Sequence, residues 1–186
     1  MAKTNGHVGK NISKSGSTIG NSFAPMSLQE IEPELYVFGP KDLNLVFDHK
    51  TDIKSMIAKM KEEQFFEFPR LVMLTHGFWG NSKSKWMHDL KDRFIAESDQ
   101  TFIIIGWGKG ADFGAYKYAQ SVANVEPLGK WLGALTLEMK RKVGNKIKIW
   151  GIGEGIGAHI MGISGRISHA FHRITGNFLF CFKFCI

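Results

Sequence analysis

Cysteine is nearly absent from the sequence: the 186 residues include only two, Cys181 and Cys185, both close to the end. Cysteines placed there cannot staple the body of a fold, and they do not identify the redox compartment. Long hydrophobic runs are also missing, since none reaches the roughly 18 apolar residues that indicate a membrane span. The sequence therefore predicts a chain that is not transmembrane.

The N-terminal region lacks both carboxylates and the apolar stretch of a secretory signal peptide. On this feature alone we expect the chain to stay in the cytosol. Residues 1–25 are rich in glycine, serine, asparagine and lysine, with too little apolar surface to offset the entropy of ordering them. We predict a disordered basic arm over residues 1–25.

The net charge of +7 is distributed along the chain, with basic residues interspersed among acidic ones. This pattern favours a solvated basic surface over a dedicated polyanion site, and we expect no nucleic-acid partner. An alternative is that Lys140-Arg141-Lys142 binds an anionic polysaccharide or anionic lipid, in which case binding to heparin would weaken with salt.

Strand and helix signals begin after the arm. Residues 35–38 and 43–47 are apolar and flank a Gly-Pro-Lys-Asp turn at 39–42, which predicts a hairpin. Apolar residues then recur at helical spacing over residues 53–60, and Asp52 is placed to complement the positive end of that helix.

Short continuous apolar runs at residues 71–75 and 102–105 are typical of strands buried on both faces of a parallel sheet. Pro127 suits the first position of the next helix, which Gly144 can close. Residues 147–152 predict a further strand. The alternation of strands and helices indicates an α/β domain with a mainly parallel sheet.

A glycine-rich turn, Gly-Glu-Gly-Ile-Gly-Ala-His at residues 153–159, follows the last predicted strand. Gly153, Gly155 and Ala158 match the dinucleotide fingerprint G-x-G-x-x-G/A, which also needs an acidic residue about 20 positions later. Glu154 is the last carboxylate side chain in the sequence, so dinucleotide binding is disfavoured and we expect no cofactor.

The same turn matches the nucleophile elbow G-x-S-x-G, a sharp strand-to-helix turn that exposes a serine above the sheet. Gly153 and Gly157 are the two flanking glycines, which the tight turn needs, and the following helix N-terminus helps to stabilise an oxyanion. Gly155 stands where the serine belongs. Every part of the motif except the nucleophile is present.

Four segments together resemble the pancreatic-type lipase family of α/β-hydrolases, in the same order and with similar spacing. They are Thr75-His76-Gly77-Phe78, which looks like the family's HGF segment; Gly106-Trp107, where the family usually has Asp-Trp; residues 153–159, which resemble GHSLGAH; and Gly162-x-x-Gly165-Arg166 with residues 173–176, which are similar to the stretch before the catalytic aspartate.

The resemblance extends from about Glu34 to Gly176 and implies an incomplete α/β-hydrolase fold, a mainly parallel sheet with helices on both faces. We therefore predict one lipase-like domain over residues 26–176. Residues 177–186 depart from the family and form an aromatic tail of uncertain origin, either a segment that pairs with the sheet edge or an artefact of the gene model.

In serine hydrolases of this type, serine attacks an ester carbonyl, histidine removes its proton, an acid orients the histidine, and backbone amides hold the oxyanion. By resemblance, Gly155 occupies the nucleophile position and the oxyanion amides belong to Phe78 and Ile156. The aspartate position falls on Asn177 or Phe178, and the family's histidine lies beyond this sequence. We predict that this form is catalytically inactive.

Other candidate side chains receive structural interpretations. Ser164 lies seven positions past the elbow, about 10 Å along a helix, which is too far to use the oxyanion amides, so we interpret it as a packing residue. His159, His169 and His172 have no carboxylate or cysteine at ligand spacing. We therefore expect these histidines to be structural or exposed, and we expect no metal site.

The resemblance also implies a lipid or lipid-like ester ligand and an extracellular location, because family members are generally secreted. An altered N-terminus would reconcile that location with the missing signal peptide. The family includes yolk proteins that lack the serine, so a storage or carrier role has precedent. The alternative is that this sequence is part of an active secreted triacylglycerol lipase or phospholipase A1.

Overall fold

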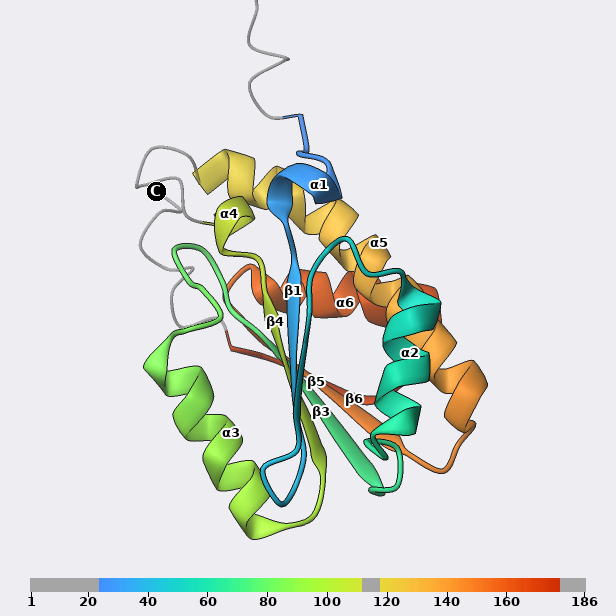
Figure 1. Cartoon of the computed structure of the whole chain (residues 1–186). Coiled ribbons are helices and arrows are strands. Elements are labelled where there is room, and N and C mark those ends of the chain that lie inside the picture. Colours follow the sequence, from blue (N-terminus) through green and yellow to red (C-terminus); the bar gives the residue numbers. More distant parts are fainter. Residues whose placement is uncertain (1–23, 112–117, 178–186) are drawn as a thin grey trace, which may run out of the picture.

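The computed structural model describes residues 24–111 and 118–177, and these residues build one six-stranded sheet in the order β2-β1-β4-β3-β5-β6 (Figure 1). Strand β1 pairs antiparallel with β2 and β4, whereas β4, β3, β5 and β6 are parallel. The predicted mainly parallel sheet is confirmed. The strands are β1 (Glu34–Phe38), β2 (Asn44–Phe47), β3 (Arg70–Thr75), β4 (Thr101–Gly106), β5 (Lys148–Glu154) and β6 (Phe171–Asn177).

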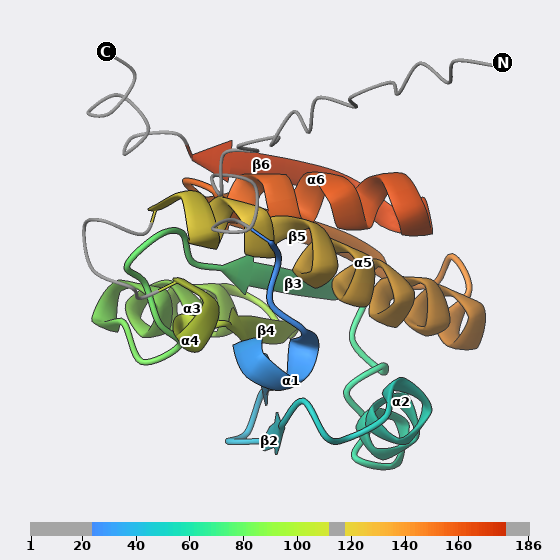
Figure 2. The same ribbon diagram turned by 90° about the horizontal axis from the view of Figure 1, so that it is seen from above.

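Helices cover both faces of this sheet, as predicted. Helix α3 packs on one face, while α2, α5 and α6 pack on the other (Figures 1 and 2). The helices are α1 (Leu28–Ile31), α2 (Ile53–Glu62), α3 (Lys85–Glu97), α4 (Gly108–Ala111), α5 (Tyr118–Val143) and α6 (Gly157–Ser168). Most of the predicted N-terminal arm (1–23) and C-terminal tail (178–186) lies outside the described residues.

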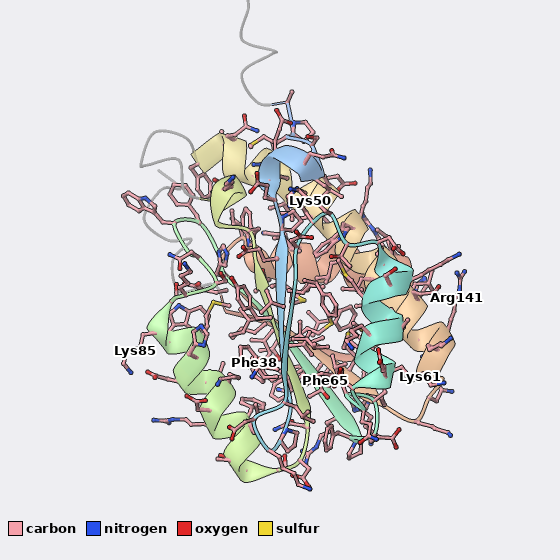
Figure 3. All side chains as sticks on the ribbon, in the orientation of Figure 1. Phe38, Lys50, Lys61, Phe65, Lys85 and Arg141 are labelled. Atoms are coloured by element: carbon pink, nitrogen blue, oxygen red, sulfur yellow. The ribbon has the colours of Figure 1, made fainter. Side chains whose placement is uncertain are left out.

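The apolar runs of the central strands feed two separate cores. In β3, Leu71 and Met73 face the helices α2 and α5, whereas Val72 and Leu74 face α3. Alternate side chains of a strand point to opposite faces, so a strand covered on both sides needs apolar residues at every position. Figure 3 shows the side chains filling the space between the sheet and its helices.

The hairpin and the first long helix follow their sequence signals. Gly39 N donates to Leu43 O at 2.8 Å and closes the turn between β1 and β2. Asp52 caps α2, because its carboxylate accepts a hydrogen bond from Ser55 N at 3.1 Å. A side-chain acceptor here satisfies one of the donors that the first helical turn leaves unpaired.

The predicted start of α5 at Pro127 is wrong. The helix is described from Tyr118, and Pro127 lies inside it, where its ring nitrogen cannot donate to the preceding turn. Tertiary contacts hold the segment before the proline: Asn124 Oδ1 accepts from Met26 N at 2.9 Å, and its Nδ2 donates to Gly110 O at 3.1 Å. The predicted end is confirmed, with Gly144 at φ 65° donating to Lys140 O.

Helices α5 and α6 lie against each other, and Ser164 is part of their interface. Its side chain is fully buried, with Oγ 3.3 Å from Thr136 Oγ1 of α5. Nearby, a Cβ added to Gly129 would lie 2.6 Å from Ile163 Cβ, which shows how closely the two helix backbones approach. The interpretation of Ser164 as a packing residue is confirmed.

Candidate functional site

Three neighbouring parallel strands end at the same edge of the sheet. Thr75 of β3 is the register partner of Ile105 in β4 and of Gly153 in β5. The residues that follow these strands, His76, Trp107 and Gly155, therefore lie at one carboxyl edge. In open α/β sheets this edge is where ligands bind.

The elbow has the predicted strand-to-helix form. Strand β5 ends at Glu154, Gly155 has a left-handed φ of 51°, and α6 begins at Gly157. A Cβ added to Gly153 would lie 2.5 Å from Ala158 N, and one added to Gly157 would lie 2.5 Å from His76 O. Backbone therefore approaches both flanking glycines too closely for any side chain.

Gly155 differs from its two neighbouring glycines because it has space around it. The nearest heavy atom to an added Cβ would be Gly77 Cα, at 3.9 Å. The position predicted for the nucleophile is thus open and sterically able to hold a small side chain, although its positive φ strains any residue other than glycine. In this chain no side-chain oxygen is present at that position.

The loop after β3 lies directly against the elbow. A Cβ added to Gly77 would lie 2.7 Å from Glu154 O and 3.5 Å from Gly155 Cα. Gly77 N also donates a hydrogen bond to Glu154 Oε2 at 3.2 Å. Phe78 directly follows Gly77, and Ile156 directly follows Gly155, so both are next to the contact between the loop and the elbow. The assignment of their amides to an oxyanion site stays a prediction.

His76 fixes this loop to the end of β4. Its Nε2 accepts from Trp107 N at 3.0 Å, so Nδ1 carries the proton, and it lies 2.9 Å from Gly77 O. Trp107 Nε1 donates to His76 O at 3.0 Å, and the two rings stack at 5.2 Å. Burial lowers the pKa of His76 from 6.5 to about 4, against a smaller opposite effect of the Gly77 carbonyl.

The buried His76 predicts an acid-sensitive fold. The unfolded chain takes up a proton near pH 6.5 and the folded chain only near pH 4, so stability is complete above pH 6.5 and falls as the pH drops. We expect the free energy of unfolding to decrease by about 3 kcal/mol across this window. Urea unfolding at a series of pH values measures it. A His76→Gln variant with an unchanged slope between pH 6.5 and 4.5 would contradict this assignment.

Gly106 stands where the family usually has aspartate. Neighbouring side chains fill the space that a side chain at this position would occupy. A Cβ added to Gly106 would lie 2.6 Å from Ser82 Cβ and 3.5 Å from Glu34 Oε2. Glu34 accepts hydrogen bonds from Ser82 Oγ at 3.3 Å and Tyr36 OH at 3.0 Å. Ser82 therefore occupies the space next to Gly106, and a carboxylate from the neighbouring strand β1 lies close by.

Aromatic side chains gather at this edge of the sheet, a feature that the sequence analysis missed. Trp79 is 57% exposed, and its ring stacks on that of Phe78, with centroids 5.7 Å apart. The ring of Phe78 in turn meets that of Tyr118 edge-on at 5.1 Å. Trp79 has a φ of 65°, unusual for a bulky residue, and its N–H donates to Ala111 O. The sequence gave no indication of this cluster, because Tyr118 lies about 40 positions after Phe78 and Trp79.

The remaining sequence candidates are three histidines. His159, His169 and His172 are exposed, as expected. Among residues 24–111 and 118–177, no group of three histidine, cysteine, aspartate or glutamate side chains could hold a metal ion. No helix in that same part of the chain has the length and apolar character needed to cross a membrane.

Comparison with known proteins agrees with the geometry of the elbow and its neighbouring loop. The model of the lipase family matches residues 1–177. The chain belongs to the lipase family. The six strands and their helices are thus part of an α/β-hydrolase fold, and the predicted relationship to pancreatic-type lipases is confirmed.

Two curated relatives are matched over the same length of 109 residues. This chain is 28% identical to lipase member H of Xenopus tropicalis and 27% identical to lipase member H-A of Xenopus laevis. Each match covers 58% of this chain and 23% of the relative. The chain therefore aligns with about a quarter of the length of these curated relatives.

Proposed function

We propose that this protein is a lipase-family member that binds a lipid or lipid-like ester and, in this form, does not hydrolyse it. The observation that carries the proposal is Gly155: the elbow backbone is formed, but the residue at its apex has no attacking atom. In a comparable triad, loss of the nucleophile lowers turnover by about 10⁶.

Hydroxyl groups elsewhere near the elbow are engaged in the fold. Thr75 Oγ1 is fully buried and donates to Ile105 O at 3.3 Å. Ser82 Oγ donates to Glu34, and Ser164 Oγ lies in the interface between α5 and α6. None of these three is presented on the turn that follows β5, so none replaces the missing serine.

Support for lipid binding comes from the aromatic side chains at the same edge. Trp79 and Tyr118 are both exposed, and Phe78 lies between them and adjoins the elbow loop. Tryptophan and tyrosine combine a large apolar body with a polar tip, which suits contact with an acyl chain near water. Binding without cleavage would suit a carrier or storage role, which we propose by analogy with the yolk proteins of this family.

A fluorophosphonate probe tests the inactive part of the proposal, because it reacts with activated serines whatever the substrate. We expect no covalent labelling of the purified protein, while an active pancreatic-type lipase labels in the same experiment. Mass spectrometry of the intact protein makes the measurement. Labelling that disappears in a Ser164→Ala variant would show that Ser164 is a nucleophile and would contradict the proposal.

One observation favours the alternative, that the sequence is a partial record of an active secreted triacylglycerol lipase or phospholipase A1. The space around Gly155, with its nearest neighbour 3.9 Å from an added Cβ, would admit a serine. A sequenced cDNA that encodes serine at position 155, followed by aspartate and histidine downstream, would establish this alternative. An extracellular location is proposed on either account.

An anionic polysaccharide has weaker support as a partner. Of the predicted cluster in the last turn of α5, Arg141 and Lys142 are exposed and Lys140 is partly buried, and Arg141 points away from the body of the protein (Figure 3). However, Arg141 pairs with Glu138 at 3.5 Å, which reduces the local positive charge. An exposed cluster of this kind is usually a solvated surface.

A further inference from the structure

A carboxylate lies beside the empty apex of the elbow. Glu154 is the last residue of β5, directly before Gly155, and its side chain is partly buried. Its Oε2 accepts a hydrogen bond from Gly77 N at 3.2 Å. The next residue in the loop is Phe78, whose amide and ring both belong to the proposed ligand site. The carboxylate is therefore close to where the head of a bound lipid would lie.

Glu154 carries a negative charge that the corresponding residue of the family's elbow motif does not have. The family segment GHSLGAH places histidine where this chain has Glu154, so an acidic side chain replaces a neutral or cationic one. Gly77 N is a neutral donor and leaves the negative charge of the carboxylate in place. The same hydrogen bond occupies one of the backbone donors of the loop that faces the elbow.

We propose that Glu154 makes this site select neutral acyl ligands over anionic ones. The inference rests on the proposed lipid-binding function and adds the class of ligand. An ionised fatty acid held near Phe78 would bring a second negative charge next to Glu154, and like charges repel most strongly where water is partly excluded. An ester or another neutral head group carries no such penalty and needs only hydrogen-bond donors.

Two fluorescent probes with the same acyl chain test the selection: cis-parinaric acid and its methyl ester, titrated above neutral pH so that the acid is ionised. We expect the protein to bind the ester at least about tenfold more tightly than the acid. In Glu154→Gln the acid should gain about tenfold in affinity while the ester is unchanged. Glutamine keeps an oxygen that accepts from Gly77 N, so the contact itself is retained.

Glu97→Gln serves as the matched control, because it makes the same change in net charge at an exposed residue of α3. It should alter neither affinity. A second measurement needs no variant: added salt screens the repulsion, so the difference between acid and ester in the unaltered protein should narrow.

The outcomes separate the two proposals. If the protein binds the ester, and the acid binds equally well to the unaltered protein and to Glu154→Gln, selection by charge is overturned while lipid binding stands. Failure of every variant to bind either probe contradicts the proposed lipid-binding function and removes the selection with it. A gain in acid affinity that Glu97→Gln reproduces assigns the effect to net charge and also overturns the role of Glu154.

Discussion

Alanine at Gly153 or Gly157 is expected to lower the free energy of unfolding by at least about 3 kcal/mol, a large share of the roughly 5–15 kcal/mol that stabilises a typical domain. At both positions the atoms nearest to the new Cβ are backbone, 2.5 Å away, at Ala158 N and at His76 O. The first of these atoms cannot move aside without shifting α6, and the second cannot do so without shifting the loop after β3. Urea unfolding monitored by circular dichroism measures the loss.

Two other glycines of the same region supply the controls. Gly162, inside α6, has nothing within 4 Å of an added Cβ, so Gly162→Ala should stabilise the protein by up to about 1 kcal/mol. Gly155→Ala adds a side chain in open space at a positive φ and should cost only about 1–2 kcal/mol. Equal losses at Gly153, Gly155 and Gly162 would show that the backbone contacts of the elbow are not the cause.

The largest expected difference is in the rate of ester hydrolysis. With a short-chain nitrophenyl ester, the protein is expected to act about 10⁶-fold more slowly than an active lipase, because no group at position 155 can form an acyl-enzyme. Backbone donors near the elbow leave at most a small residual acceleration over the uncatalysed reaction. Release of nitrophenol against a buffer blank measures it.

The control for the turnover measurement is a variant that keeps the fold but has a different side chain at the apex of the elbow. Gly155→Ala retains the turn and adds no oxygen, so its rate should equal that of the unaltered protein. Turnover well above the blank that both proteins share would place an active nucleophile somewhere other than the elbow. Loss of that turnover in Ser164→Ala would identify the residue.

Much of the fold could be predicted because its signals are local. The apolar run over residues 71–75 indicated a strand covered on both faces, and glycines at 153, 155 and 157 indicated a sharp strand-to-helix turn. Prediction failed where distant contacts override local preference. Pro127 suggested a helix start, yet the helix continues before the proline, where Asn124 contacts Met26 and Gly110.

The candidate site divides in the same way. The sequence by itself determined that glycine stands at position 155, where the elbow motif predicts the nucleophile, because side-chain identity needs no structure to read. Only the tertiary structure decided which groups surround that position. The hydrogen bond from Gly77 to Glu154 joins residues 77 positions apart, and the pairing of β3 with β5 brings them together. Such contacts arise from strand register and long-range packing, which no short segment of sequence encodes.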